Sequence, residues 1–211
     1  MQNASTSAGI RTLAILGAGG HGRVVADSAK EAGWSDVAFF DDNASAHAQV
    51  KIRGTTNELF ERVRSFGGVI VAFGDNRLRL SVYQRLIDAG ATLTSVVHPF
   101  SFVSRAAAIG SGTVVVAGVV VNAGAQVGMA CILNTGCSID HDSVLADGVH
   151  VSPGARIAGQ VRVGERTWIG IGASIRHQIV VGSDVVIGAG AAVVNDVPNG
   201  VRVVGVPARQ M

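Results

Sequence analysis

An aliphatic residue recurs every six positions through the second half of this 211-residue chain. The series runs without an insertion from Val103 to Val193, and each of its sixteen positions holds Val, Ile or Leu. A second series, four residues after each aliphatic, holds small or branched side chains such as Thr113, Val119 and Ala125. Neither an α-helix nor an ordinary strand has this period. The pattern therefore predicts a repeat architecture for this half of the chain.

Six residues to a face and three faces to a coil give a triangular prism in which both series point inward. Each coil buries its edges only against the next coil, so the stability of such a fold is collective along its axis. We expect an all-β parallel β-helix over residues 99–197, with residues 198–211 as its C-terminal tail. Cys131 and Cys137 both fall in the second inward series, which predicts buried, unreactive thiols.

The first half alternates short apolar runs with helical patterns. Strands are predicted at 13–16, 37–40, 69–73 and 94–97, and helices at 22–32, 57–64 and 77–89. Strands that alternate with helices in units of this size indicate a parallel sheet. We therefore expect an α/β Rossmann-like domain over residues 11–98. Residues 1–10 contain neither a charged residue nor the apolar run of a signal peptide, which predicts a disordered tail and not a signal peptide.

The charge pattern excludes two classes of partner. The net charge is +2 and no basic run is present, so nothing in the sequence predicts nucleic-acid binding. Residues 106–139 contain no charged side chain and have the length of a membrane span. The six-residue repeat runs through them unbroken, however, so we expect no membrane insertion. Two cysteines are too few for a disulfide framework, which favours a cytoplasmic location.

His141 and Asp142 are the first candidates for chemistry. Ile139 and Ser143 hold the inward positions on either side, so the His141 side chain must point out of the prism. An outward imidazole followed by a carboxylate is suited to act as a general base. A histidine that merely lies at the surface is the alternative. His177, two coils further on, is expected to lie about 10 Å from His141, too far for a pair.

A glycine-rich segment lies between the first predicted strand and the first predicted helix. Gly17, Gly19 and Gly22 fit the pattern G-x-G-x-x-G, whose turn and helix N-terminus can hold a phosphate. Asp41 ends the next strand, as in NAD-binding domains. The domain is short and has no second mononucleotide-binding half, which disfavours NAD. A purely structural turn remains the alternative.

Several longer segments carry a resemblance to known proteins. The run I-G-S-G-T-V at 109–114 and its successors resemble the hexapeptide acyltransferase superfamily, which implies a left-handed coil and a homotrimer. The segments C-I-L-N-T-G-C-S-I-D-H-D at 131–142 and G-V-H-V-S-P-G-A-R-I-A-G at 148–159 resemble nucleotide-sugar acetyltransferases of the PglD/NeuD type. These include the bacillosamine-pathway N-acetyltransferase and sialic acid O-acetyltransferases. The likeness extends from G-A-G-G-H-G at 17–22 to G-V-P-A-R at 205–209.

The resemblance assigns roles on the prism. It implies that His141 is the general base and that Asp142, where relatives have Glu, supports it. It places His150 beside the acetyl group of acetyl-CoA, and Ile171, Gly172 and Ala189 along the pantetheine arm. Gly159 lies one coil beyond His141, where a glycine leaves space and its N–H is a candidate donor to the oxyanion of the reaction.

The resemblance also implies a nucleotide-sugar site in the N-terminal domain. Glycines and a histidine of the first turn would contact phosphates, and the two aspartates after the second strand would hold uridine or the amino sugar. The loop after the third strand would complete the site. The residues concerned are Gly19, Gly20, His21, Gly22, Asp41, Asp42, Gly74, Asp75 and Asn76.

Together these features predict an acetyl-CoA-dependent N-acetyltransferase. The expected acceptor is the 4-amino group of a UDP-linked 4-amino-4,6-dideoxy sugar, with no metal and no NAD involved. His141 and His150 are half a coil apart, so they should lie on opposite sides of the prism and act together only across a subunit boundary. One alternative is an O-acetyltransferase of sialic acid or another surface sugar. Another is a non-catalytic β-helix scaffold or metal-binding trimer, for which His141, His150 and His177 lack the expected spacing.

Overall fold

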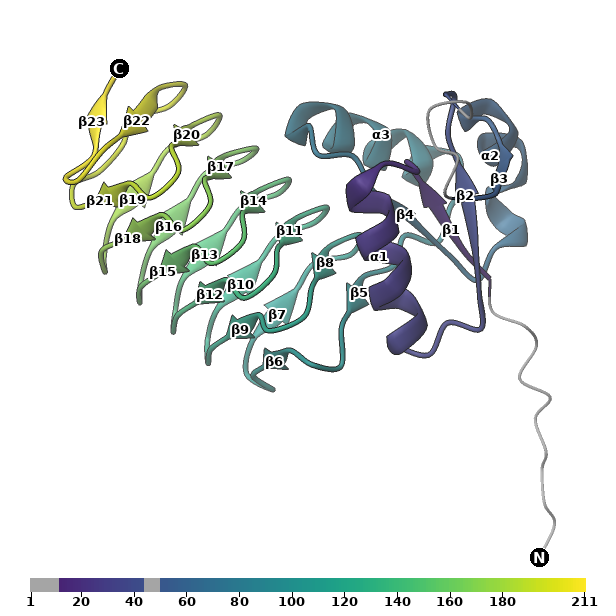
Figure 1. Cartoon of the computed structure of the whole chain (residues 1–211), viewed down its shortest axis with the longest axis horizontal. Coiled ribbons are helices and arrows are strands. Elements are labelled where there is room, and N and C mark those ends of the chain that lie inside the picture. The colour runs from purple at the N-terminus through teal and green to yellow at the C-terminus, as the bar shows by residue number, and fades with distance from the viewer. Residues whose placement is uncertain (1–11, 44–49) are drawn as a thin grey trace, which may run out of the picture.

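The structure is a computed structural model that describes residues 12–43 and 50–211. It contains an α/β domain followed by a long stack of β-coils (Figure 1). The tail predicted at residues 1–10 lies outside the described residues. Within them, no helix is both long enough and apolar enough to cross a membrane.

The N-terminal domain is built on a four-stranded parallel sheet of order β3-β2-β1-β4. Its strands are β1 (Thr12–Leu16), β2 (Asp36–Phe40), β3 (Ile52–Gly54) and β4 (Gly68–Val71). Its helices are α1 (Gly20–Glu31), α2 (Thr56–Arg62) with a short 3₁₀ turn η2 (Val63–Ser65), and α3 (Asn76–Asp88). The three helices and the first three strands predicted are confirmed. The short strand β3 was not predicted, because so brief a segment has too few residues to show alternation.

The helices cover both faces of this sheet. Apolar residues of α1 pack with Leu13, Ile15 and Ile70 on one face, whereas α2 and α3 pack with Leu16 and Phe40 on the other. The chain order reverses between β1 and β4, which is the place where parallel sheets of this kind bind ligands. The loops after β1 and β4 therefore meet at the carboxyl edge of the sheet.

The second part is a left-handed parallel β-helix of very short strands. One coil takes three hexads, so that His150 is in register with Ile132 of the coil before it and Trp168 of the coil after it. The strands are β5 (Val96–Val97), β6 (Phe102–Val103), β7 (Ala108–Ile109), β8 (Val114–Val115), β9 (Val120–Val121), β10 (Gln126–Val127), β11 (Ile132–Leu133), β12 (Ser138–Ile139), β13 (Val144–Leu145), β14 (His150–Val151), β15 (Arg156–Ile157), β16 (Arg162–Val163), β17 (Trp168–Ile169), β18 (Ser174–Ile175), β19 (Val180–Val181), β20 (Val186–Ile187), β21 (Ala192–Val193), β22 (Arg202–Val204) and β23 (Arg209–Gln210).

These strands form the three faces of a prism. The long face contains β5, β8, β11, β14, β17, β20, β22 and β23. The six-strand face contains β6, β9, β12, β15, β18 and β21, and the five-strand face contains β7, β10, β13, β16 and β19. In the long face, β22 pairs parallel with β20 and β23 pairs antiparallel with β22, so the C-terminal tail continues this sheet.

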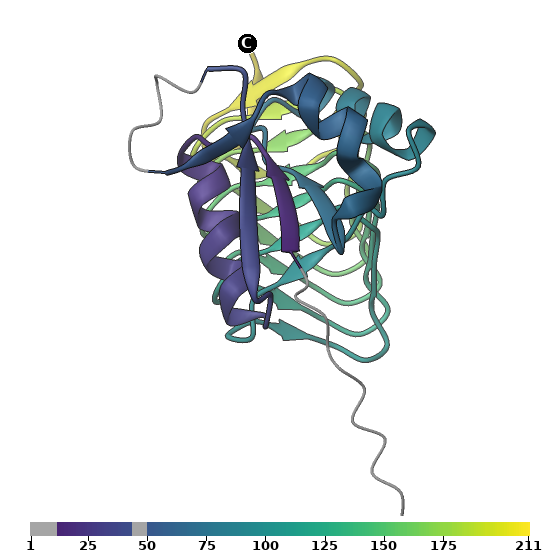
Figure 2. The same cartoon turned by 90° about the vertical axis from the view of Figure 1, so that its right-hand side faces the viewer.

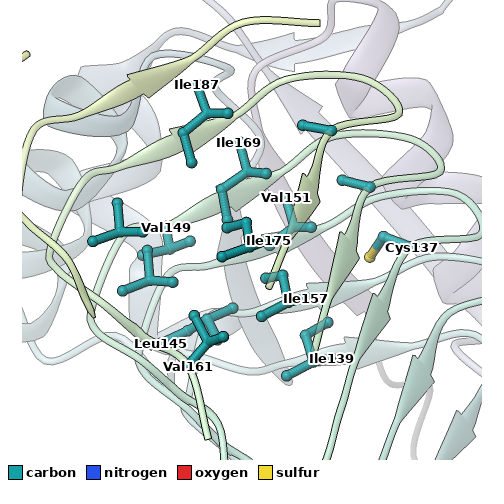
Figure 3. Packing of buried hydrophobic residues seen from close by; sticks show 14 of the residues in the cluster. Cys137, Ile139, Leu145, Val149, Val151, Ile157, Val161, Ile169, Ile175 and Ile187 are labelled. Carbon is teal, nitrogen blue, oxygen red and sulfur yellow. The ribbon is translucent and has the colours of Figure 1, made fainter. Parts of the chain in front are cut away.

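Both predicted inward series fill the prism. Every aliphatic from Val115 to Val193 is buried, and so are the small residues of the second series (Figure 3). Thr113, Ser143 and Thr167 are buried here without leaving a hydroxyl unpaired. Each donates to a backbone carbonyl and accepts an N–H from the next coil.

The two cysteines are free and buried, as predicted. Burial raises the pKa of both thiols, Cys131 and Cys137, to about 12, since a thiolate has no water to stabilise it there. Neither thiol is therefore a nucleophile at neutral pH.

The last strand predicted for the first domain belongs instead to the prism. Residues 96 and 97 form β5, which pairs with β8 of the long face, and only Leu93 bridges to Val69 of the small sheet. The reason is register, because Val96 lies one full coil before Val114 and pairs with it. The β-helix thus begins one strand earlier than the predicted first position, Val103.

The two parts share a packed interface. Figure 2 looks along the prism with the α/β domain in front of it. Residues of α1 pack against Val114 and Ile132, which face outward from the long face. Across this interface the buried Arg79 of α3 donates to the carbonyls of Ala130 and Gly148 in the prism and of Phe73 in its own domain. Its side chain is only 1% exposed. One guanidinium thus holds the loop after β4 against the coils that carry His150.

Candidate active site

His141 lies in the turn between β12 and β13 and points out of the prism, as predicted. Its side chain is 57% exposed, and its Nδ1 lies 2.9 Å from Oδ2 of Asp142. This contact raises the pKa of His141, because the carboxylate stabilises the protonated ring. With the proton of the neutral ring on Nδ1, donating to Asp142, the lone pair of Nε2 is free to accept a proton.

The backbone of Asp142 has a φ of +58°, in the left-handed region, and Gln160 has the same conformation at this position of the next coil. Below Asp142, Gly124 has no room for a side chain, since an added Cβ would collide with Oδ1 of Asp142. The aspartate at this position reaches Nδ1 of His141.

The backbone of His141 is fixed from both sides. Oδ1 of Asp140 accepts the His141 N–H at 2.8 Å and a proton from Nδ2 of Asn122 at 2.9 Å. These donors lower the pKa of Asp140, the His141 N–H most strongly. In the next coil, the N–H of Gln160 donates to the His141 carbonyl at 2.9 Å. The position of the imidazole is thus set by three consecutive coils.

Gly159 leaves the space in which the imidazole lies. A Cβ at this position would come within 2.5 Å of Nε2 and 2.6 Å of Cε1 of His141. The predicted clearance role of the glycine is confirmed by this contact. Its role as an oxyanion donor stays a prediction.

His150 is the first residue of β14 and projects from the long face. Its ring stacks on Trp168 of β17, with centroids 5.7 Å apart and planes 4° from parallel. Burial lowers its pKa to about 3, and the charge of Arg79 adds to the effect. His150 is therefore a neutral imidazole whose two nitrogens are buried and have no partner within the described residues.

His21, in the first turn of α1, lies at the interface between the α/β domain and the prism. Its Nε2 is buried without a partner in the described chain, and burial together with Arg79 lowers its pKa to about 4. His21 also contributes to the low pKa of His150, so the two rings are close. Buried polar atoms without partners are costly, and they are frequently completed by a ligand.

An apolar cavity of about 410 Å³ lies beside His150 on the long face. It brings together three of the predicted acetyl-CoA residues, His150, Ile171 and Ala189. The predicted Gly172 is an exposed turn residue next to this lining. The complete lining is Asn134, His150, Ser152, Pro153, Trp168, Gly170, Ile171, Val186, Ile187, Gly188 and Ala189.

A second, polar cavity of about 530 Å³ lies between the start of α3 and the long face. Its charged wall is an ion-pair group in which Arg77 and Arg166 both contact Asp184 at 2.9 Å. The complete lining is Gly74, Asp75, Asn76, Arg77, His150, Arg166, Trp168, Asp184, Val185, Val186 and Arg202. His150, Trp168 and Val186 line both cavities.

Packing explains part of the glycine turn. The φ of Gly17 is +107°, and its Cα faces the ring of Phe73. Gly22 lies against the carbonyl of Gly17 with no room for a Cβ, whereas Gly20 has open space around it. Gly19 is the N-cap of α1 and provides no side-chain acceptor, so the first N–H groups of this helix lack a capping side chain. The turn is thus both structurally required and open at Gly20.

The three aspartates predicted for the nucleotide-sugar site all have structural partners. Oδ2 of Asp41 accepts the N–H of Ala18 in the glycine turn at 2.8 Å. Asp42 accepts both the N–H and the hydroxyl of Thr56 at the start of α2. Asp75 accepts the N–H of Leu78 and so caps α3. These carboxylates fix the loops around the carboxyl edge of the sheet.

Gly74 lies in the loop after β4, and Asn76 is the first residue of α3. Nδ2 of Asn76 donates to the carbonyl of Arg166 at 2.9 Å and so joins α3 to the prism. Gly74 has open space around its Cα. The predicted loop therefore reaches the junction where His21 and His150 lie.

The predicted residues form two groups on opposite sides of the prism. His141 and Asp142 lie at the corner between the six-strand and five-strand faces, and His150 lies on the long face. The glycine turn and the apolar cavity lie on the side of His150. Sequence reasoning missed Trp168 and Arg79. Trp168 is the register partner of His150 in the next coil, and that spacing was the available signal.

The alternative of a metal-binding trimer that uses His141, His150 and His177 finds no support in these positions. His177 is exposed. Among residues 12–43 and 50–211, no group of three or more His, Cys, Asp or Glu side chains is placed to hold a metal ion.

The fold and the His141–Asp142 pair define a hexapeptide-repeat acyltransferase, and comparison with known proteins agrees. Residues 12–86 match the PglD N-terminal domain, and residues 160–195 match the bacterial transferase hexapeptide (six repeats). The chain is 30% identical over 212 residues to the GDP-perosamine N-acetyltransferase of Escherichia coli O157:H7, covering 93% of this chain and 95% of that protein.

Solved structures agree over nearly the whole chain. The acetyltransferase domain of PglB from Neisseria gonorrhoeae FA1090, in complex with acetyl coenzyme A, is 41% identical with a TM-score of 0.92, covering 96% of this chain and 100% of that one. PerB from Caulobacter crescentus, in complex with CoA and GDP-perosamine, is 36% identical with a TM-score of 0.91, covering 96% and 98%. The chain belongs to the PglD/NeuD type of nucleotide-sugar acetyltransferases.

Proposed function

We propose that this acetyltransferase moves the acetyl group of acetyl-CoA to the 4-amino group of a UDP-linked 4-amino-4,6-dideoxy sugar, with His141 as general base. The observation that carries the proposal is the 2.9 Å contact from Nδ1 of His141 to Asp142, which leaves the lone pair of Nε2 free to accept a proton. The relatives solved with acetyl-CoA and with a nucleotide-linked amino sugar support the two substrates.

In this mechanism the amine nitrogen attacks the thioester carbonyl carbon and Nε2 of His141 takes the amine proton. The carbon–sulfur bond then breaks, and the proton held on Nε2 of His141 passes to the leaving sulfur, so that CoA leaves as the thiol. Asp142 keeps Nδ1 protonated and stabilises the imidazolium as it forms. General-base catalysis of this kind contributes about 10²–10⁴-fold to the rate.

The acetyl-CoA arm is assigned to the apolar cavity. A pantetheine chain suits a wall made of Ile171, Ala189 and glycine backbone, because the wall is apolar. His150 lies at one end of this cavity as a neutral imidazole with unpartnered nitrogens. Its ring N–H would donate to the thioester oxygen, where charge develops during attack.

The nucleotide-sugar is assigned to the carboxyl edge of the small sheet. The uncapped start of α1, the open face of Gly20 and the unpartnered Nε2 of His21 suit phosphate oxygens. Asp41 holds the shape of this turn and Asp42 holds the start of α2, and we assign both to the nucleoside or the amino sugar. The loop at 74–76 closes the site toward the prism.

A homotrimer with active sites between subunits is part of the proposal. His141 and His150 lie on opposite sides of one prism, so one chain does not present both to a single acetyl group. A neighbouring prism that sets its His141 corner against the long face of the first would bring them together. Free, buried thiols at Cys131 and Cys137 suit a reducing compartment, and we place the protein in the cytoplasm on that basis.

A substrate panel tests this proposal. The protein is incubated with acetyl-CoA and, separately, UDP-4-amino-4,6-dideoxy sugars, GDP-perosamine or sialic acid, and thiol release and product mass are measured. We expect transfer to the amine of a UDP-linked sugar and its loss in His141→Ala. A preference for GDP-perosamine would overturn the choice of nucleotide. Transfer only to a sialic acid hydroxyl would overturn N-acetylation.

A further inference from the structure

Trp168 belongs to a row of residues that face outward along the long face. The row holds Val114, Ile132, His150, Trp168 and Val186 at successive coils. Trp168 is the largest of these side chains, and it is pinned at two points. Its ring stacks on His150, and its Nε1 donates to Oγ of Ser152 at 2.8 Å.

The same indole separates the two cavities described above. Trp168 lines both the apolar cavity and the polar one, together with His150 and Val186. It remains 48% exposed, because its outer edge forms the rim between them. Replacing the indole with a smaller side chain would therefore join the two spaces beside His150.

We propose that Trp168 sets the length of the acyl group that this protein accepts. The inference rests on the proposed function, in which the thioester lies at His150 in the apolar cavity. A methyl group on the thioester carbon fits against the fixed ring. A propionyl or butyryl chain has to displace the ring or bend away from it, and the ring is held by both its stack and its hydrogen bond.

The chain itself suggests the variant that tests this. Val186 occupies the same register position one coil further on, so Trp168→Val keeps a side chain that this face already accommodates. A single methylene in a tight pocket changes specificity about 10–200-fold. We therefore expect the ratio of kcat/KM for butyryl-CoA to that for acetyl-CoA to rise by at least about 10-fold in Trp168→Val.

Phe102→Val is the matched control. Phe102 is also an exposed aromatic at the first position of a two-residue strand, but it lies on the six-strand face and lines neither cavity. Its butyryl-to-acetyl ratio should equal that of the unmodified protein. Ser152→Ala, which removes only the hydrogen bond to the indole, should raise the ratio by less than Trp168→Val does.

Two readouts separate this inference from the proposed function. In a Trp34→Phe protein, Trp168 is the one remaining tryptophan, and acetyl-CoA should quench its fluorescence at lower concentration than butyryl-CoA does. An unmodified protein that uses butyryl-CoA as well as acetyl-CoA would overturn the inference and leave the function intact. So would an unchanged ratio in Trp168→Val. If no amino sugar is acetylated, the proposed function fails, and equal quenching by both thioesters would then overturn the inference as well.

Discussion

The imidazole of His141 lies against the bare Cα of Gly159, one coil further along the prism. A Cβ on Gly159 would approach to 2.5 Å of Nε2, the nitrogen assigned to proton transfer. The φ of Gly159 is not in the left-handed region, so the backbone itself has no need of glycine. The site, and not the fold, therefore requires this glycine.

Gly159→Ala should accordingly damage catalysis more than stability. The added methyl group pushes the imidazole away from its position, and a misplacement of about 1 Å costs on the order of 10²-fold in rate. Steady-state kinetics should show kcat falling by about 10–10²-fold, while the thermal midpoint stays near that of the unmodified protein. A variant with unchanged kcat would show that His141 has no fixed working position.

A double-mutant cycle isolates this contact. In a His141→Ala background, Gly159→Ala should cost almost nothing further, because the group with which it collides is gone. Equal losses in both backgrounds would assign Gly159 another role, such as the oxyanion donor.

His141→Ala by itself should lower kcat by about 10²–10⁴-fold, the usual contribution of a general base. The apparent affinity for acetyl-CoA should change little, because the apolar cavity assigned to the pantetheine arm is lined by residues of the long face and not by His141. Calorimetry with acetyl-CoA on the variant measures that affinity. Near-normal turnover would rule out the assignment.

The pH profile gives a separate test of Asp142. The carboxylate raises the pKa of His141, and His141 must be unprotonated to accept the amine proton, so kcat/KM should rise with pH through that pKa. Asp142→Asn removes the charge, and asparagine tolerates the left-handed backbone of this position. The acidic limb of the profile should then move to lower pH while the maximal rate decreases. If the acidic limb of the Asp142→Asn profile stays at the same pH, the group that titrates there is not His141.

Arg79 connects the two domains and should be required for stability. Arg79→Leu leaves the carbonyls of Ala130, Gly148 and Phe73 buried without a donor, at about 1–3 kcal/mol for each group left unpaired. We expect chemical denaturation to show a loss of several kcal/mol in the free energy of unfolding. Arg77→Leu, which removes an ion pair of a largely exposed side chain, should cost under about 1 kcal/mol. Similar values for the two variants would contradict the role given to Arg79.

The sequence predicts the prism well because the hexads are strictly spaced and each inward position is buried. His141 and its outward direction follow from the same register. The extent of the prism was harder to predict, since Val96 fits the coil but sits in a run that also suits a small parallel sheet. Asp42 and Asp75 illustrate a different limit. The resemblance to the family suggested substrate contacts, whereas the structure shows that they hold helix starts, which only tertiary contacts reveal.

The cavity wall shows why the rest of the site required a structure. Trp168 lies one coil after His150 and Arg79 lies in the other domain, far before it in the chain, yet both act on its ring. No local pattern marks the low pKa of His150, because it depends on burial at a domain interface. Sequence spacing did predict correctly that His141 and His150 lie on opposite sides of one prism.

A site shared between subunits is tested most directly by complementation. His141→Ala and His150→Ala proteins carrying different tags are mixed, dissociated, reassembled and purified through both tags. Each parent protein should be nearly inactive, whereas hybrid trimers regain sites that combine an intact His141 from one chain with an intact His150 from another. In a closed ring, every mixed trimer of either composition has one of its three subunit boundaries intact, so activity near a third of the unmodified level is expected. Hybrid trimers with no more activity than their parents would contradict a shared site.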